Sequence, residues 1–244
     1  MNVLNEKNRL TKIDPFRYVL YADSLSDSAM ATVLSNTSLV SIVTAARTLC
    51  LSVIHDSFGL DRSVVISVKA IRCRRMEPST GGHGYDLSFE VQEAKGPRID
   101  TVGANVVQSF ATGTYETQFS FGIIPQSFDR FIRLSRNFTD YSELAMPHDQ
   151  GEVLSTSDNG YTYRAGELDR LINGKRTDHI PAIRLLAIAI SGPFATAEKD
   201  LVSASIEFFK YSDPRKTLSV ERSGTVGVMK QDAETVARFE LTQG

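Results

Sequence analysis

The sequence contains no long apolar run and carries little net charge. Its 244 residues are 41% hydrophobic, and 27 Lys and Arg against 29 Asp and Glu give a formal net charge of -2. No segment reaches the roughly 18–20 continuous apolar residues that a membrane span needs. Residues 1–15 lack the apolar core of a secretory signal. We therefore expect a soluble, cytoplasmic protein that binds neither nucleic acid nor a membrane surface.

Cysteine is scarce, and several familiar catalytic motifs are missing. The two cysteines, Cys50 and Cys73, lie in apolar or strand-like stretches, which favours buried free thiols over a disulfide framework. There is no Gly-x-Ser-x-Gly elbow and no spaced Cys/His cluster. The glycine-rich "GGHG" lacks the Lys-Ser/Thr and the following helix of a phosphate-binding loop. We predict no metal site and no cofactor.

The clearest element that is present is a helix over residues 38–58. Apolar residues recur there at the i, i+3, i+4, i+7 spacing of one helical face. Thr37 or Ser38 can cap its start, and Gly59 is a natural stop. The apolar face is wide, so we expect other parts of the chain to cover most of this helix.

Strand-like stretches follow this helix, and the same order returns in the second half. "RSVVISVKAIRCRR", "GYDLSFEVQEA", "VGANVVQSFATG" and "TYETQFSFGI" show alternation and β-branched residues between Gly/Pro turns. The second half offers the helix "PAIRLLAIAI", then "KDLVSASIEFFKYS", "KTLSVERSGTVGVMK" and "ETVARFELTQ". We predict repeats over residues 1–124 and 161–244, joined by a crossover linker with some helix at 125–160.

A long apolar helix wrapped by an antiparallel sheet, twice over, is a double (tandem) hotdog of the α+β class. A single hotdog unit normally dimerises, because each half-sheet has an edge that must be paired or covered. A tandem chain can form that pair internally. We expect either a monomeric pseudo-dimer or a homodimer.

The stretch "KRTDHIPAIRLLAIAI" raises the question of why an apolar helix begins with a His. Asp178, His179, Ile180, Pro181 and Ala182 resemble the "D-H-x-P-G" turn of the A-factor biosynthesis (AfsA-type) hotdog proteins. "SLVSIVTAARTLCLSVIHDSFGL" is similar to that family's "LLLEAARQ…HRYFG" segment. Thr44 and Ala187 stand where the family usually has Glu.

The resemblance implies a reaction and its partners. Members join a β-ketoacyl group from acyl carrier protein to the hydroxyl of dihydroxyacetone phosphate, giving a precursor of butenolide or γ-butyrolactone signals. For this chain it implies an acyltransferase that takes an acyl carrier protein or acyl-CoA thioester and a small phosphorylated or hydroxylated acceptor. Two alternatives stay open: a hotdog thioesterase or dehydratase, and a non-catalytic protein that binds an acyl chain or a partner.

Four residues are the candidate site. His179 precedes a helix N-terminus whose dipole can polarise a thioester carbonyl, and it can take a proton from an attacking hydroxyl. Asp178 can orient His179; the structural alternative is that Asp178 caps the helix and His179 is a surface turn residue. Arg47 is predicted to bind a phosphate or phosphopantetheine, or else to pair with a nearby carboxylate. Arg184 is also assigned to substrate binding.

The other three histidines are weaker candidates. His55 ends the first predicted helix, where a cation suits the helix dipole, so a structural role is favoured. His83 lies in a glycine loop without companion ligands for a metal. We interpret His148 as a solvated residue of the linker.

Overall fold

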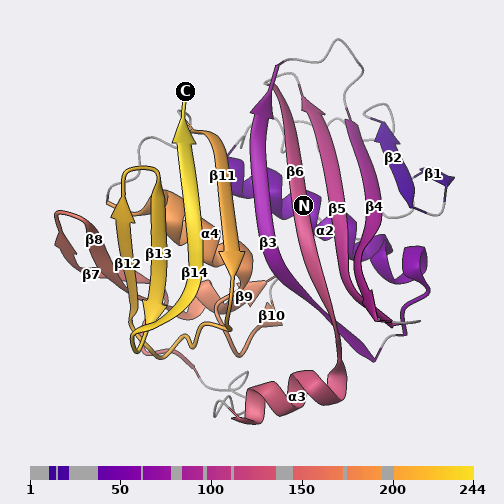
Figure 1. Cartoon of the computed structure of the whole chain (residues 1–244). Coiled ribbons are helices and arrows are strands. Elements are labelled where there is room, and N and C mark those ends of the chain that lie inside the picture. Colours follow the sequence, from indigo (N-terminus) through magenta and orange to yellow (C-terminus); the bar gives the residue numbers. More distant parts are fainter. Residues whose placement is uncertain are drawn as a thin grey trace. The chain divides into compact units, whose positions relative to one another are not determined.

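The computed structural model describes residues 11–14, 16–21, 38–61, 63–77, 84–95, 98–110, 113–135, 145–172, 175–193 and 201–244. The chain divides into two compact units, Met1–Gln126 (unit 1) and Ser127–Gly244 (unit 2). Figure 1 labels their helices and strands. Each unit is described by itself.

Unit 1 is an antiparallel sheet with one long helix. Its strands are β1 (Thr11–Asp14), β2 (Arg17–Tyr21), β3 (Val64–Met76), β4 (Gly84–Lys95), β5 (Arg98–Phe110) and β6 (Gly113–Pro125). Within this unit they run in the order β1-β2-β4-β5-β6-β3. The helix is α2 (Leu39–Phe58), which contacts β3, β5 and β6. A central helix on a large antiparallel sheet is the hotdog arrangement, as the sequence predicts.

The ends of α2 fall where the capping residues predict. Ser38 is the N-cap, and its hydroxyl accepts a hydrogen bond from the Ser41 amide at 3.1 Å. Gly59 ends the helix in the left-handed conformation at φ 58°, which a glycine adopts without a Cβ clash. By length and composition alone α2 could cross a membrane, but the apolar stripe from Leu39 to Ile54 is buried in the core of unit 1.

Both cysteines are buried free thiols, as predicted. Cys50 lies on the buried face of α2, and Cys73 lies on β3 where the Thr117 hydroxyl contacts its sulfur at 3.4 Å. Burial raises the pKa of Cys73 to about 11, although the Thr117 hydrogen bond opposes this. Both thiols therefore serve as small apolar side chains.

Unit 2 has its own antiparallel sheet and a shorter central helix. The strands are β7 (Glu152–Ser157), β8 (Gly160–Arg164), β11 (Leu201–Phe208), β12 (Leu218–Ser223), β13 (Val226–Gln231) and β14 (Glu234–Gln243), in the order β11-β14-β13-β12-β8-β7. The helices are α3 (Gln126–Ser135), the 3-10 turn η5 (Glu167–Arg170) and α4 (Ala182–Ser191). A small ribbon joins β9 (Leu171–Ile172) to β10 (Lys175–Arg176).

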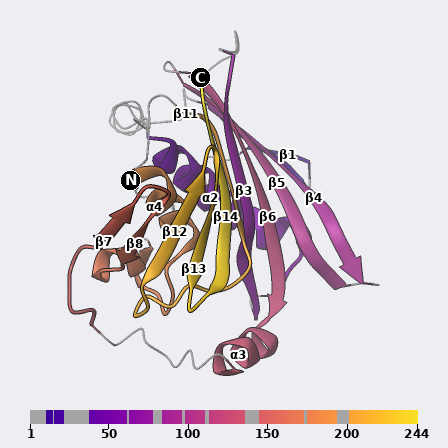
Figure 2. The ribbon, with the colours of Figure 1, turned by 60° about the vertical axis from the view of Figure 1, so that its left-hand side comes forward.

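Helix α4 packs its apolar side chains into unit 2. Leu185, Leu186, Ile188, Ala189 and Ile190 are buried, and α4 lies on one side of the strands β12–β14 in two views (Figures 1 and 2). The Tyr161 hydroxyl on β8 donates a 2.6 Å hydrogen bond to the Ile188 carbonyl. This bond ties β8 to the C-terminal half of the helix.

Two features of unit 2 differ from the sequence prediction. Residues 216–230 form a hairpin of β12 and β13 and not one strand, because Gly224 adopts φ 61° and turns the chain. Strands β7 and β8 were not predicted. β7 is exposed along its length, so the alternation of buried and exposed residues that marks a strand in a sequence is missing.

Candidate active site

The predicted pair of Asp178 and His179 is present in unit 2. His179 Nδ1 lies 2.7 Å from Asp178 Oδ1, and both side chains are about four-fifths buried, with 21% and 16% exposed. A carboxylate on Nδ1 favours the tautomer in which Nδ1 carries the proton and Nε2 is the basic nitrogen. The pair is therefore arranged for proton transfer at Nε2.

This pair stands immediately before α4. Ile180 is 1% exposed, and its amide donates to the Ser212 carbonyl at 2.9 Å, which anchors the turn. Pro181 is the N-cap of α4, and no side chain caps this end in the described structure. Because the first-turn N–H groups of a helix carry partial positive charge, they can stabilise an oxyanion.

The structural alternative for Asp178 is therefore not observed. Its carboxylate contacts the ring of His179, while Pro181 occupies the cap position that the alternative gave to Asp178. The Thr177 hydroxyl shares its one proton between the carbonyls of Arg170 (2.7 Å) and His179 (2.6 Å). These bonds hold the turn from its other side.

Tyr211 packs against the ring of His179 at a tilt. The two ring centroids are 4.7 Å apart with an interplanar angle of 50°. The Tyr211 hydroxyl donates to Asp129 Oδ1 at 3.0 Å, and Asp129 is 6% exposed on α3. Sequence reasoning missed both residues, since no spacing connects positions 129, 179 and 211 before the chain folds.

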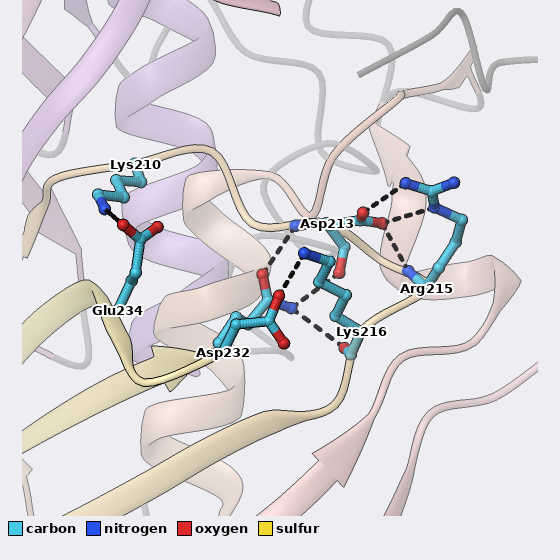
Figure 3. A network of polar contacts seen from close by, with 7 residues as sticks. Lys210, Asp213, Arg215, Lys216, Asp232 and Glu234 are labelled. Carbon is cyan, nitrogen blue, oxygen red and sulfur yellow. Dashed lines mark hydrogen bonds and ion pairs between the residues drawn. The ribbon is translucent and has the colours of Figure 1, made fainter. Parts of the chain in front are cut away.

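A network of polar side chains holds the segment that carries Tyr211 (Figure 3). The Asp213 amide donates to Gln231 Oε1 at 2.9 Å, and Gln231 Nε2 donates to the Asp213 carbonyl at 2.7 Å. Arg215 binds the Asp213 carboxylate through two nitrogens, at 2.9 and 2.6 Å. Burial raises the pKa of Asp213, but the Arg215 hydrogen bonds and charge outweigh it, so that pKa is lowered.

The outer part of the same network consists of ion pairs. Lys216 pairs with Asp232, and Lys210 Nζ lies 2.5 Å from Glu234 Oε1 (Figure 3). The hydrogen bond from Lys216 to Asp232 raises the pKa of that lysine. A polar cavity of about 280 Å³, with Tyr211 in its wall, adjoins these residues.

Arg184 lies in the first turn of α4 and is tied to a buried carboxylate. Its Nε donates to Asp169 Oδ1 at 2.5 Å, and its side chain is still 42% exposed while Asp169 is fully buried. Asp169 also accepts from the Tyr163 hydroxyl and the Gly166 amide, both at 2.8 Å. Burial, and next the bond to Asp169, raise the pKa of Tyr163. Arg184 is thus oriented near the start of α4 without being covered.

Arg47 lies in unit 1, on α2. It is half-buried, and its Nε is buried without a hydrogen bond. Burial lowers the pKa of Arg47, and nearby Cys50 opposes this shift. The carboxylate partner of the structural alternative is not found among the described residues.

The other three histidines lie in different places. His55 ends α2, with Nδ1 3.4 Å from the Leu60 carbonyl. His83 lies outside the described residues. His148 lines a cavity with three arginines. In the part of the chain that is described, no three His, Cys, Asp or Glu side chains come together as a metal site.

Comparison with known proteins gives independent support for the fold. No family model matches the chain, and no curated protein matches it. A structure described as an oleoyl thioesterase from Lactobacillus plantarum is similar, with a TM-score of 0.50, 9% identity, and coverage of 92% of this chain and 93% of that one. The 12:0-ACP thioesterase from Umbellularia californica gives 0.49, 11% identity, and coverage of 96% and 99%. The likeness to the oleoyl thioesterase structure supports the hotdog fold and nothing narrower, so the A-factor family stays a prediction.

Proposed function

We propose that this chain hydrolyses acyl thioesters, with Asp178 and His179 as its catalytic pair. The observation that carries the proposal is the imidazole held at Nδ1 by a carboxylate, directly before a helix N-terminus that no described side chain caps. The fold likeness to a structure described as a thioesterase points the same way. This is the thioesterase alternative, and it displaces the acyltransferase as the leading function.

The chemistry follows from the two groups. His179 Nε2 takes a proton from a water molecule as the water oxygen attacks the thioester carbonyl carbon. The first-turn amides of α4 stabilise the oxyanion of the tetrahedral intermediate. The C–S bond then breaks, the thiolate takes the proton from the imidazolium, and a carboxylic acid and a thiol leave. Asp178 stabilises the charged imidazolium between these steps.

The proposed substrate is an acyl-CoA or acyl carrier protein thioester, and the two units are proposed to be the two halves of a tandem hotdog. Arg47 is the candidate for the phosphates of the carrier arm, because its guanidinium is half-buried and its Nε has no hydrogen bond. A guanidinium in this state gains from binding an anion, since part of its hydration is already lost.

The test is thiol release from a series of acyl-CoA chain lengths. We expect the wild type to release thiol, and His179→Ala to lower kcat by roughly 10²–10⁴-fold, the usual contribution of a positioned proton acceptor. Asp178→Asn should reduce kcat less, because an amide oxygen still accepts a hydrogen bond from Nδ1. Thiol release by folded His179→Ala at the wild-type rate would end the assignment.

A matched control is His55→Gln, which removes an imidazole that lies at the end of α2 in unit 1. Its kcat should equal that of the wild type. If the wild type binds acyl-CoA and releases no thiol from any chain length, the non-catalytic acyl-binding alternative is favoured.

One observation keeps the acyltransferase as a second candidate. Arg184 presents a partly exposed guanidinium in the first turn of α4, beside the proposed oxyanion site, and could hold a phosphorylated acceptor. The same His179 would then take its proton from an alcohol instead of water. Mass spectrometry with a β-ketoacyl thioester and dihydroxyacetone phosphate separates the two: an acyl ester indicates transfer, and free acid indicates hydrolysis. Arg184→Gln should raise KM for the acceptor only.

A further inference from the structure

A second cavity in unit 2 has an unusual wall. It measures about 310 Å³ and is formed by residues near 145–148, 164–170 and 214–217. Among the described residues, Arg164, Arg170, Arg215 and His148 line it, and no Asp or Glu does. Apart from Thr217, the other described residues of the wall are apolar. We call this the arginine cavity; its volume is at the lower end of the range for small-molecule sites.

In the described part of the chain, the carboxylates that pair with these arginines do not line the cavity. Arg164 Nη1 lies 3.0 Å from Glu152, and Arg170 Nη1 lies 3.6 Å from Glu167. Arg215 is bound by Asp213, as Figure 3 shows. Each pair thus has its cationic member in the wall and its anionic member outside it. Each ion pair is neutral overall, but its positive end faces the cavity. The electrostatic potential inside the cavity is therefore positive.

Arg170 gives the wall a rigid cationic centre. It is 1% exposed, and its Nε donates to the Thr177 carbonyl at 2.9 Å. The Thr177 amide and hydroxyl return hydrogen bonds to the Arg170 carbonyl, at 2.9 and 2.7 Å. A buried guanidinium held in this way loses little entropy when an anion binds to the cavity.

We propose that the arginine cavity binds a small organic anion, with its carboxylate or phosphate at the arginines and a short apolar stem against the remaining wall. Thr177 connects this site to the catalytic turn, because its hydroxyl also donates to the His179 carbonyl. The site is independent of thioester hydrolysis. It would stand if His179 proved to have no catalytic role.

The experiment is calorimetric titration of the full-length protein with hexanoate, hexyl phosphate and neutral 1-hexanol. We expect at least one anion to bind and hexanol not to bind. Binding of hexanoate alone identifies a carboxylate ligand, and binding of hexyl phosphate alone identifies a phosphate monoester. The ring signals of His148 should shift during the titration, which NMR can follow because the chain has only 4 histidines.

Arg164→Gln is the test variant, since its ion pair with Glu152 is half-exposed and adds little to stability. It should weaken anion binding by roughly tenfold, the effect of losing one hydrogen bond to a charged group. Arg74→Gln is the matched control: Arg74 pairs with Glu116 in unit 1 and does not line the cavity. Its affinity should equal that of the wild type.

A second variant, His148→Gln, guards against a folding defect in the first and should also weaken binding. Hexanol binding as tight as hexanoate binding, or unchanged anion affinity in both folded variants, would overturn the proposal. The proposal would also be overturned if the wild type bound neither hexanoate nor hexyl phosphate.

Discussion

Two buried serines differ in whether their hydroxyls have partners. Ser57 Oγ in unit 1 lies 3.0 Å from the Tyr18 hydroxyl and donates to the Val53 carbonyl at 2.9 Å. Ser212 in unit 2 is fully buried, and its Oγ has no hydrogen bond. A buried hydroxyl without a partner has lost its hydration and gained nothing in exchange.

We therefore expect Ser212→Ala to raise the free energy of unfolding, by up to about 1 kcal/mol. Ser57→Ala, the matched control, should lower it by about 1 kcal/mol because two hydrogen bonds are lost. Urea unfolding of the three proteins measures both. A loss of stability in Ser212→Ala equal to that in Ser57→Ala would show that the Ser212 hydroxyl is satisfied in solution.

Arg47 is expected to be unfavourable for folding and useful for binding. Its guanidinium is partly dehydrated, and burial lowers its pKa. Replacement by Met keeps the apolar part of the side chain and removes the charge, so Arg47→Met should stabilise the chain by about 1 kcal/mol. Its affinity for acyl-CoA should fall at the same time. Chemical unfolding and acyl-CoA titration of one preparation test both signs. A loss of stability would contradict the first expectation, and unchanged affinity for acyl-CoA would contradict the binding role.

At the scale of elements, two tight turns of unit 2 have similar left-handed backbone conformations but different residues, so opposite substitutions can be compared in them. The turn between β13 and β14 has Asp232 at φ 50° and Ala233 at φ 65°, whereas the turn between β12 and β13 has Gly224 at φ 61°. The left-handed conformation costs an L-residue with a Cβ roughly 1–2 kcal/mol. Alanine therefore pays a penalty in one turn that glycine avoids in the other.

Ala233→Gly removes the strain of the left-handed conformation and should stabilise the chain by about 0.5–1 kcal/mol. The gain is smaller than the strain itself, because glycine has greater conformational freedom in the unfolded state. Gly224→Ala should destabilise it by about 1 kcal/mol, although a Cβ there meets no neighbour within 4 Å. Thermal unfolding of both variants measures the pair. If both changes shift Tm in the same direction, the backbone conformation does not control these turns.

Helix α3 contacts the candidate site through Asp129. Asp129 on α3 binds the Tyr211 hydroxyl, and the Tyr211 ring packs on His179. Tyr211→Phe keeps the ring and loses the hydroxyl, so we expect a kcat loss of a few-fold. Tyr211→Leu removes the ring contact and should cost more. The ¹⁵N shifts of the His179 ring nitrogens report whether Nδ1 keeps its proton, which a purely structural role for Tyr211 would leave unchanged.

The elements that the sequence predicted well share one property. α2 and the strands β3 to β6 have regular apolar periodicity with Ser, Gly or Pro at their ends, and such signals are local. The Asp178–His179 pair is local too, because its two members are adjacent. Asp129, Asp169 and Tyr211 were missed because each acquires its partner through the fold, across 82 positions for the Asp129–Tyr211 bond.

At the scale of the whole molecule, the two units differ in what they bury. Among the described residues of unit 1, the buried polar side chains are uncharged: Ser57, Thr101, Gln108, Thr114 and Thr117. Unit 2 buries Asp129, Asp169, Arg170 and Asp213. Buried charged groups must be paired in the folded state, so unit 2 depends on its internal ion pairs more than unit 1 does.

The direction of the pH dependence of unit 2 follows from two carboxylates. Burial raises the pKa of Glu167, but the Met146 amide and the charges of Arg176 and Arg170 outweigh it, so its pKa is lowered, as is that of Asp213. A lowered folded-state pKa adds stability that is fully present above the unfolded-state pKa of about 4. That stability is lost as the pH falls towards the folded-state pKa. Acid should therefore destabilise unit 2 before unit 1.

Hydrogen exchange followed by mass spectrometry at pH 6, 5 and 4, with labelling times scaled for the intrinsic rate, tests this expectation. Peptides from η5 and from the segment around Asp213 should lose protection first, while α2 and β6 should keep it. Asp213→Asn should be less stable than the wild type at pH 7 and should lose less on acidification, because the group that titrates is gone. Earlier loss of protection in α2 than in η5 would mean that the buried carboxylates do not set the acid limit of this protein.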